Sequence, residues 1–395
     1  MKKIKFYFKA HATGLLLLVL PLLLACGARK GSVAASADVV AADSSLVSPH
    51  YAEGFKVRCQ ADGVRLVDIV DPQLSSDDEG ALSTQTCHVA LVPRGVEAAV
   101  PEGYTVVNVP IEHCILMTTL QLSGFIALDA LDYVSGMTST KSLKNADVRK
   151  RIDDGRIVKI GIEGNFDSEL VMAARPDVIF ISPFKRGGYE VLTESGITLI
   201  PHLGYKENSA LGQAEWIKFI GMFVGMERQA NEYFAQVEQQ YNKVKAMADS
   251  VSVRPTVMSG EMHGGQWYAV GGRNSLAQMF RDAGADYVLH DNAETGGVTL
   301  DFEEHYARAA NADFWRILNA YDGDFSYDAL LQSDARNADF NAFRKHQVVY
   351  CNMKQTAYYE LAPMHPDQLL EDFVFAFHPS LLPKDYQPHF YQLLK

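Results

Sequence analysis

The spacing of hydrophobic and polar positions divides the folded part of the chain into segments of different kinds. From residue 51 to 103, short alternating segments such as FKVRC and VRLVDIV are separated by turn residues, a pattern typical of antiparallel strands. From residue 104 to 209, compact apolar segments such as CILMTT and PDVIFISP alternate with amphipathic ones, which is typical of parallel strands followed by covering helices. The pattern predicts a small β appendage and then an N-terminal α/β lobe.

A long helical pattern over residues 210–250 follows the first lobe. A continuous helix of about 40 residues would extend about 60 Å, which exceeds an ordinary crossover within one domain. Gly221 and Gly225 weaken this helix and could mark a bend. Strand–helix alternation then resumes over residues 251–395. We therefore predict the α/β class, with two parallel-sheet lobes joined by one long helix.

The N-terminal segment has the features of a targeting sequence. Four lysines precede the apolar residues LLLLVLPLLL, which are too few to span a bilayer as a helix. The following LLAC resembles a bacterial lipobox, so we predict a signal peptide over residues 1–25 and lipidation of Cys26. A plain secretory signal with a coincidental cysteine is the alternative. Residues 26–50 are rich in Ala, Ser and Gly without periodicity, and predict a flexible tether.

Charge and cysteine content narrow the class of protein. The chain has a formal net charge of −12 at pH 7 and no basic stripe, which argues against a nucleic-acid partner. The cysteines after residue 26 contain no CxxC pair, which argues against a zinc ribbon or a thioredoxin motif. Cys59 and Cys87 could form a disulfide, with buried thiols as the alternative. Cys114 and Cys351 are the remaining cysteines.

Two segments in different lobes share one pattern. DSELVMAARPDVIF begins at Asp167 and DFEEHYARAANADFW begins at Asp301, and each has a glutamate two residues later, Glu169 and Glu303. Each continues as a short helix and an apolar strand. Aspartate at the start of a helix is a typical N-cap. The pattern therefore predicts equivalent helix starts in the two lobes.

Glu303, Glu304 and His305 are consecutive, which at first suggests a metal or acid–base site. Adjacent helical residues point about 100° apart, whereas two ligands on one helix face need a spacing of three or four. We therefore predict no metal site here. Asp301 and Glu304 have the spacing of a capping box, and His305 is predicted to be at the surface or half-buried.

Five segments together are similar to one known family. They are GNFDSELVMAARPDVIFIS, GQAEWIKFIGMFVG, WYAVGGRNSLAQMFRDAGADYVLHDN, LDFEEHYARAANADFW and PDQLLEDFVFAFHPSLLP. With the lipobox and the two lobes, they resemble the substrate-binding lipoproteins of ABC importers, in the class III branch for iron–siderophore complexes, haem or vitamin B12. The second and fifth segments are similar to bacteroidete-type members. The resemblance extends from about Phe55 to the C-terminus.

This resemblance implies a ligand-binding protein without catalytic residues and without a cofactor of its own. It implies a monomer, anchored in the periplasm or cell envelope through Cys26, that works with an ABC permease and indirectly with its ATPase. In this family one glutamate of each lobe docks onto permease arginines, and the matching positions are Glu169 and Glu303. Exposed carboxylates on rigid helix starts suit bidentate pairs with arginine. Stabilisation of the helix dipole is the alternative role.

A ligand cleft is predicted between the lobes, because ligands of open α/β sheets bind beyond the carboxyl ends of the strands. Trp267 and Tyr268 could pack a planar ligand or belong to an ordinary core. Arg273 could bind an anionic group or make a loop contact. The predicted cleft residues are Thr119, Gln121, Glu163, Phe166, Lys185 and Tyr205 in the first lobe, and His263, Trp267, Tyr268, Arg273, Tyr358 and Tyr359 in the second.

The candidate residues leave the ligand open. Haem would need an axial Tyr or His, an iron–siderophore complex would use Arg or Lys with aromatics, and a corrinoid would need mostly aromatic packing. One alternative is a zinc or manganese receptor, which needs three or four converging His and carboxylate groups. Another is a tetrapyrrole chelatase-like enzyme that uses His263 with Glu163 or Glu261.

Overall fold

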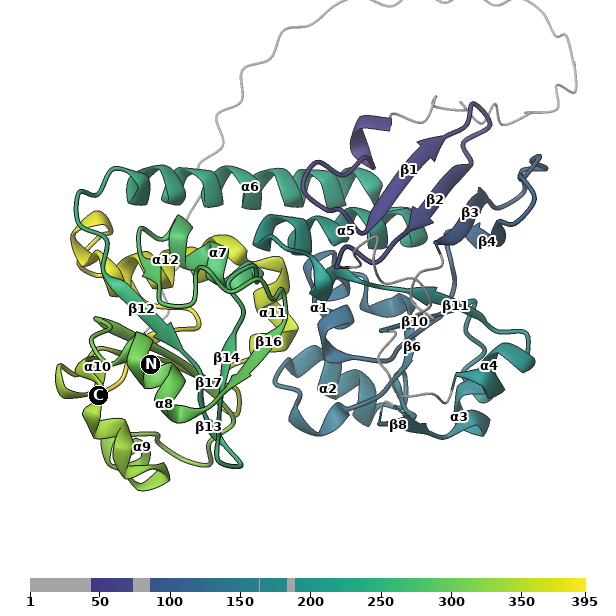
Figure 1. Ribbon diagram of the computed structural model, residues 1–395. Helices are drawn as coiled ribbons and strands as arrows, with labels where there is room; N and C mark the ends of the chain where they lie inside the picture. Colours follow the sequence, from purple (N-terminus) through teal and green to yellow (C-terminus); the bar gives the residue numbers. More distant parts are fainter. Residues whose placement is uncertain (1–43, 74–85, 163, 183–188) are drawn as a thin grey trace, which may run out of the picture. The chain divides into compact units, whose positions relative to one another are not determined.

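The computed structural model in Figure 1 describes residues 44–73, 86–162, 164–182 and 189–395. After a short 3-10 helix η1 (Ser44–Leu46), the chain forms a four-stranded sheet in the order β1-β2-β3-β4. Its first three strands are antiparallel, and β4 is parallel to β3. The strands are β1 (Phe55–Cys59), β2 (Arg65–Ile69), β3 (Cys87–Pro93) and β4 (Thr105–Val109).

The predicted β1–β2 hairpin is present, and Gly63 adopts the positive φ of +85° that its turn requires. The sheet continues to Val109, past the predicted end of the appendage at residue 103. It also shares the core of the first lobe, because the Phe55 ring lies 5.0 Å from the Trp216 ring in an edge-on contact. The β segment is therefore an integral layer of the first lobe.

Of the two alternatives left open for Cys59 and Cys87, the disulfide is excluded. Cys59 pairs with Arg65 at one end of β2, and Cys87 pairs with Ile69 at the other end. Four residues of strand separate these positions by about 13 Å, which is beyond the reach of a disulfide. Cys114 and Cys351 are buried thiols of different lobes.

The first lobe contains a parallel sheet in the order β11-β10-β5-β6-β7. Its apolar strands agree with the compact hydrophobic segments of the sequence, since both faces of such a sheet are covered. The strands are β5 (Cys114–Leu116), β6 (Val134–Met137), β7 (Val158–Lys159), β10 (Val178–Ile181) and β11 (Thr198–Pro201). The helices are α1 (Thr119–Ala127), η2 (Leu131–Tyr133), η3 (Thr140–Ser142), α2 (Ala146–Asp153), α3 (Ser168–Ala173), α4 (Glu190–Glu194) and η4 (Gly204–Lys206), with a small hairpin of β8 (Gly161–Ile162) and β9 (Asn165–Phe166).

Two helices replace the single helix predicted over residues 210–250. The helices α5 (Ala210–Val224) and α6 (Glu227–Asp249) are separated at Gly225, whose φ of +70° ends α5 in the left-handed conformation. They pack against each other closely enough that a Cβ at Gly221 would lie 2.7 Å from Ala230. The break lies at Gly225, one of the two glycines predicted to mark a bend, and this glycine lets the chain reverse although the hydrophobic period continues through the turn.

The helix α6 connects the lobes, because it packs on α5 of the first lobe and on α12 (Pro366–Phe377) of the second (Figure 1). Tyr241 of α6 donates a hydrogen bond of 2.8 Å to Asp282 of the second lobe. The helix α6 has 23 residues, enough to cross a bilayer by length alone, but only one of its faces is apolar. Within the described ranges, no helix combines the length and the apolar character needed to cross a membrane.

The second lobe is built around the sheet β15-β12-β17-β18-β19, which is parallel except for β19. A three-stranded antiparallel sheet, β13-β14-β16, lies in the same lobe. The strands are β12 (Thr256–Ser259), β13 (Glu261–His263), β14 (Gln266–Val270), β15 (Asp286–Tyr287), β16 (Gly297–Leu300), β17 (Phe314–Asn319), β18 (Val348–Asn352) and β19 (Gln392–Leu393). The remaining helices are α7 (Ser275–Asp282), α8 (Phe302–Ala309), α9 (Tyr327–Ser333), η5 (Ala335–Asp339), α10 (Asn341–Arg344), α11 (Tyr358–Leu361), η6 (Ala362–Met364) and η7 (Pro379–Leu381).

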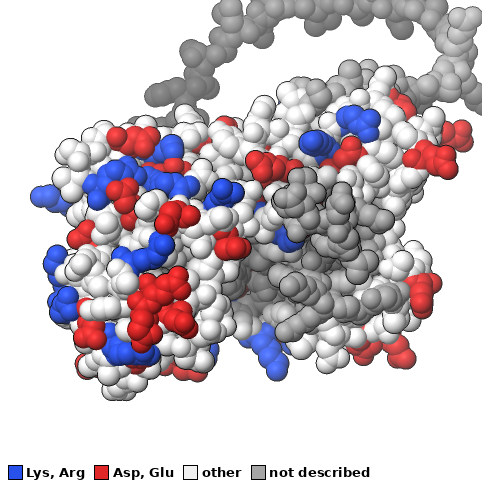
Figure 2. Space-filling view, viewed as in Figure 1, with Lys and Arg blue, Asp and Glu red and all other residues white. Residues whose placement is uncertain are grey.

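The predicted fold class, two α/β lobes with parallel sheets, is confirmed. On the face shown in Figure 2, acidic and basic side chains are interspersed over the described residues without a broad basic stripe.

Candidate functional site

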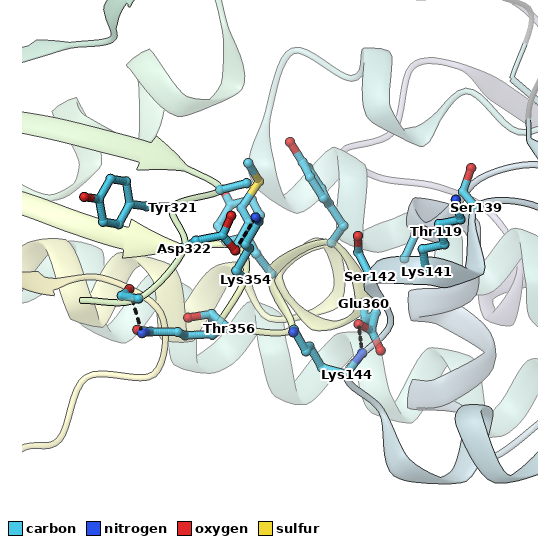
Figure 3. Close-up of a pocket in the computed structure, with 16 residues that line it drawn as sticks. Thr119, Ser139, Lys141, Ser142, Lys144, Tyr321, Asp322, Lys354, Thr356 and Glu360 are labelled. Carbon is cyan, nitrogen blue, oxygen red and sulfur yellow. Dashed lines mark hydrogen bonds and ion pairs between the residues drawn. The ribbon is translucent and has the colours of Figure 1, made fainter. Parts of the chain in front are cut away.

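A pocket of about 650 Å³ lies where loops of the two lobes meet (Figure 3). Its first wall is formed by Thr119 and by residues between 139 and 144, which follow β5 and β6. Its second wall is formed by residues 320–323 and residues between 353 and 360, which follow β17 and β18. All four strands are parallel strands of their sheets, so the pocket lies at the carboxyl ends where ligands of such sheets bind.

The second wall is held together by Asn352, the buried last residue of β18. Its side-chain amide donates to the carbonyls of Tyr321 at 3.0 Å and Gly323 at 3.4 Å. Its side-chain oxygen accepts from the backbone N–H groups of Tyr321 at 3.3 Å and Lys354 at 2.9 Å. One asparagine therefore fixes both loops of this wall. Sequence reasoning missed it, although a polar residue ending the apolar strand VVYC is a usable signal.

Aromatic side chains line the second wall. Tyr321 and Tyr359 remain 37% and 43% exposed, whereas Tyr358 is half-buried and packs edge-on against Tyr359 at 5.4 Å. Behind them, the hydroxyl of Tyr391 accepts a hydrogen bond from Nε of buried Arg316 at 2.9 Å. Exposed rings in a concave site supply flat apolar surface together with a polar hydroxyl, which suits a planar or partly apolar ligand.

Cationic side chains give the first wall a positive charge. Lys141 and Lys144 line the pocket, and neither has an ion pair within the described residues. The lysine of the opposite wall, Lys354, is paired with Asp322 at 2.5 Å. The positive charge of the first wall is therefore not neutralised by the protein residues that the structure describes.

The two walls are joined by a buried carboxylate. Glu360 of α11 accepts hydrogen bonds from the backbone N–H groups of Lys144 at 2.6 Å and Asn145 at 2.7 Å, and it is only 3% exposed (Figure 3). Asn145 is the N-cap of α2, so a second-lobe side chain fixes the start of a first-lobe helix. The helices α1 and α11 also pack together. This inter-lobe contact sets the position of the loop that carries both lysines.

Three of the predicted cleft residues line this pocket: Thr119, Tyr358 and Tyr359. Gln121 does not, because its side-chain oxygen accepts from the backbone of Met117 at 2.9 Å and supports the start of α1. Gln121 and Tyr205 instead line a separate small cavity. Glu163, Lys185 and the lipidation candidate Cys26 lie outside the described residues.

Trp267 is not a cleft residue. Its ring is fully buried and stacks on His305, with the ring centroids 4.3 Å apart and the planes 16° apart. Its indole N–H donates to the carbonyl of Ser259 at 2.9 Å. The alternating pattern of β14 places Trp267 on the buried face and Tyr268 on the exposed face. Of the two alternatives for Trp267, the core is therefore correct.

The other predicted cleft residues lie outside the pocket. His263 and Tyr268 are exposed neighbours on the β13–β14 hairpin, with ring centroids 5.9 Å apart. Arg273 is exposed, and its backbone N–H donates to Glu294 at 3.0 Å. Phe166 stacks on Tyr189 in the first lobe. None of the four is among the residues that line the pocket.

Glu169 and Glu303 are both exposed and lie in the first turns of α3 and α8. Asp167 caps α3 as predicted, because its side chain accepts from the backbone of Glu169 at 2.9 Å. Asp301 is the N-cap residue of α8, but its side chain makes no capping hydrogen bond. The predicted capping box with Glu304 is therefore absent, since that box requires a bond from the cap side chain.

The prediction for His305 is also wrong. This side chain is fully buried, and neither ring nitrogen has a hydrogen-bond partner within the described residues. Burial lowers the pKa of His305 to about 3. The helix period pointed to a polar face, but the ring fills space between Trp267 and Phe340.

The alternatives of a metal receptor and an acid–base enzyme require clustered ligands or a hydrogen-bonded pair. The described residues contain no group of three or more His, Cys, Asp or Glu side chains arranged to hold a metal ion. Burial raises the pKa of Glu261 to about 7, and its carboxylate accepts from Asn319 at 2.9 Å. No hydrogen bond joins Glu261 to His263 among the described residues.

Comparison with known proteins shows where this architecture recurs. A family model described as "Periplasmic binding protein" matches residues 117–354. An uncharacterized lipoprotein of Methanocaldococcus jannaschii is 27% identical over 314 residues, which cover 76% of this chain and 73% of that protein. A periplasmic heme binding protein from Pseudomonas aeruginosa has a TM-score of 0.55 at 20% identity, covering 71% of this chain and 97% of that one. An ABC-type Fe3+-hydroxamate transport system from Saccharomonospora viridis has a TM-score of 0.53 at 19% identity, covering 68% and 94%.

Proposed function

The chain belongs to the periplasmic binding protein family, and on this premise we propose that it is the substrate-binding lipoprotein of an ABC importer. It captures an iron–siderophore complex or haem, or else a corrinoid, in the pocket between its lobes and delivers the ligand to a membrane permease. The observation that carries this proposal is the pocket of about 650 Å³ at the strand ends of both lobes, with tyrosines on one wall and lysines on the other.

The pocket suits such a ligand in size and chemistry. Small-molecule sites have volumes of about 300–1,000 Å³ and are lined by aromatic surface with a few polar groups. Tyr321 and Tyr359 offer exposed rings, and Lys141 and Lys144 offer positive charge. Two proteins of similar fold are named for haem and for Fe3+-hydroxamate, which supports the same class of ligand for this chain.

Docking on the permease is assigned to Glu169 and Glu303. Both carboxylates are exposed, and both lie in the first turn of a helix, in α3 and α8 respectively. Carboxylates at these positions can form bidentate pairs with permease arginines. One contact on each lobe makes docking sensitive to the separation of the lobes.

Anchoring of the protein is assigned to a lipid on Cys26, which holds the folded lobes near the membrane in the cell envelope. The support is the LLAC motif after an apolar segment and the naming of the archaeal relative as a lipoprotein. The end of the predicted tether is wrong, because Val47 is buried in the core and the backbone N–H of His50 donates to Glu215 at 2.8 Å. Residues 26–43, which lie outside the described residues, remain the proposed tether.

A titration of the mature chain tests the proposal. Haem, a tris-catecholate iron(III) complex, a tris-hydroxamate iron(III) complex and cyanocobalamin are added separately, and visible absorbance is followed. We expect saturable binding of at least one of these ligands at a single site. Binding of zinc with none of the coloured ligands would favour a metal receptor, and turnover of a tetrapyrrole would favour an enzyme. Neither alternative is supported by a geometric observation in the described residues.

A further inference from the structure

The C-terminal tail, which we define as residues 386–395, lies beyond residue 354, where the match to the family model ends. It is nevertheless part of the central sheet of the second lobe, because β19 forms an antiparallel edge next to β18. The backbone N–H of Leu394 continues this pairing and donates to the carbonyl of Val348 at 2.8 Å. The tail therefore covers the outer edge of the strand whose carboxyl end leads into the second wall of the pocket.

A buried carboxylate of α12 holds the tail in place. Asp372 is only 1% exposed, and it accepts a hydrogen bond of 2.7 Å from the hydroxyl of Tyr386. It also accepts, at 2.9, 2.7 and 2.9 Å, from the backbone N–H groups of His389, Phe390 and Tyr391. Hydrogen bonds to a charged acceptor are shorter and stronger than neutral ones, so this part of the tail has a fixed backbone.

Two aromatic side chains of the tail support Tyr358 from behind. The Tyr358 ring packs edge-on against the rings of Phe390 at 6.0 Å and Tyr391 at 5.9 Å. Both rings of the tail are buried, whereas Tyr358 lines the pocket. Edge-on contacts between aromatic rings favour one orientation, so the tail fixes the Tyr358 ring. Tyr358 is also the first residue of α11, the helix that carries Tyr359.

The hydroxyl of Tyr391 has a second role, because it is the acceptor of a buried cation. Arg316 of β17 donates to it from Nε at 2.9 Å and also from Nη2, and the guanidinium lies 5.2 Å from the centre of the Tyr391 ring. Within the described residues, Arg316 has no ion pair with a carboxylate. A buried charge is costly unless it is hydrogen-bonded, so loss of this hydroxyl would force the guanidinium toward another acceptor.

From these contacts we propose that the C-terminal tail is a positioning element of the ligand pocket, and that Tyr391 is the residue through which it acts. Its ring supports Tyr358, and its hydroxyl fixes the charge of Arg316. Neither Phe390 nor Tyr391 lines the pocket, so the tail affects the ligand only through Tyr358 and the helix α11. This inference rests on the proposed function and adds a determinant of affinity outside the region that the family model matches.

Two matched variants test the inference, and each removes one fully buried tyrosine hydroxyl from the second lobe. Tyr391→Phe keeps the ring and removes the acceptor of Arg316. The control Tyr287→Phe removes a hydroxyl that donates to the carbonyl of Val270 at 2.7 Å. Tyr287 belongs to β15, at the edge of the central sheet opposite to β19, and it lines none of the cavities described above. Both variants should unfold at a lower urea concentration than the wild type, so stability alone does not distinguish them.

Amide hydrogen exchange of the ligand-free protein provides the first readout, on peptides that cover residues 356–364. We expect exchange there to be about tenfold faster in Tyr391→Phe than in the wild type, because α11 loses its support. In Tyr287→Phe, exchange of the same peptides should stay within about twofold of the wild type. Wild-type exchange in Tyr391→Phe overturns the inference, and so does an equal acceleration in the control variant.

The four coloured ligands of the titration above provide the second readout, at conditions where both variants are folded. For each ligand that the wild type binds, Tyr391→Phe should weaken binding about threefold to tenfold, and Tyr287→Phe should change it by less than about twofold. Unchanged affinity in Tyr391→Phe overturns the inference and leaves the proposed function intact. If the wild type binds none of the four ligands, the proposed function is contradicted, and the exchange measurement alone decides whether the tail positions α11.

Discussion

The two lobes are alike at their outer helix starts and different at the pocket. Each lobe carries Asp-x-Glu at the start of a helix, with Glu169 and Glu303 exposed in the first turn. Inside the cleft, the first lobe presents lysines on the loop after β6, and the second lobe presents tyrosines on loops fixed by Asn352. The proposed docking on a permease uses the motif that the two lobes share. The proposed selection of a ligand instead uses charge on one wall and flat aromatic surface on the other.

The largest effect should come from breaking the shared feature. Replacing Glu169 and Glu303 together with alanine removes both proposed docking contacts. Each lost charge pair costs at least about 2 kcal/mol, so docking on the permease should weaken about a thousandfold. Uptake by cells should be lost, while ligand binding by the purified protein is unchanged. The adjacent change Glu304→Ala, also at an exposed site, should leave uptake intact. Loss of ligand binding in the double variant would contradict the docking role.

The next largest effect should come from removing the Glu360 contact that joins the two walls of the pocket. Glu360→Ala leaves the backbone N–H groups of Lys144 and Asn145 without their buried acceptor. Two such losses should reduce the free energy of unfolding by about 2–4 kcal/mol, measured by urea denaturation. Ligand affinity should also fall, because the lysine loop loses its support. Glu360→Gln keeps one acceptor oxygen and should lie between the variant and the wild type. Unchanged stability in Glu360→Ala would show that the contact does not hold the lobes together.

Within the described residues, each lobe buries one histidine against a tryptophan ring, His202 in the first lobe and His305 in the second. The two histidines differ in how far burial lowers their pKa values. Burial lowers the pKa of His202 to about 4 and that of His305 to about 3. The unfolded chain binds the proton near pH 6.5, so folded stability is lost as the pH falls below that value. For His305 the loss at pH 5 is about 2 kcal/mol.

His305→Phe should therefore reduce the drop in the free energy of unfolding between pH 7 and pH 5 by about 2 kcal/mol. Urea denaturation at the two pH values measures this drop. The ring of phenylalanine retains the stacking against Trp267, whose plane is 16° from that of His305. His263→Phe, at an exposed site of the same lobe, should keep the wild-type drop. An unchanged drop in His305→Phe would mean that the histidine does not contribute to acid sensitivity.

The smallest effect should come from removing one aromatic ring from the second wall of the pocket. Tyr359→Ala removes a ring that is 43% exposed in the pocket, and should weaken ligand binding by about 1 kcal/mol, or about fivefold. Tyr359→Phe should retain most of the affinity. Tyr268→Ala removes an equally exposed ring outside the pocket, and isothermal titration should show no change. A loss in Tyr268→Ala instead would place the ligand at the β13–β14 hairpin.

Most predictions that depend on local pattern agreed with the structure, with the capping box of Asp301 and Glu304 as an exception, whereas predictions that depend on packing partners did not. The strands β5, β10 and β18 coincide with the compact apolar segments, because both faces of a parallel sheet are buried. Asp167 caps its helix because the contact joins residues two and three positions apart. Whether Cys59 and Cys87 form a disulfide stayed open in the sequence, because strand register, which sets their separation, cannot be read from composition.

The candidate site was predicted only in part, for the same reason. Thr119, Tyr358 and Tyr359 were found because they follow the ends of apolar strands or lie in an aromatic segment. Lys144 and Glu360 were missed because they are 216 positions apart and meet only when the lobes pack. Trp267 was placed in the cleft although it belongs to the core, because a tryptophan has the same appearance in the sequence on either face of a strand.

The two α/β lobes, the acidic composition and the paired Asp-x-Glu helix starts follow from the sequence alone, since periodicity, charge and capping act between near neighbours. The tertiary structure alone decided that α5 and α6 form a hairpin, that His305 is buried, and that lysines face tyrosines across one pocket. These features depend on which surfaces cover one another. A hydrophobic or polar period indicates that a face is covered or exposed, but not which residue from the other lobe will lie against it.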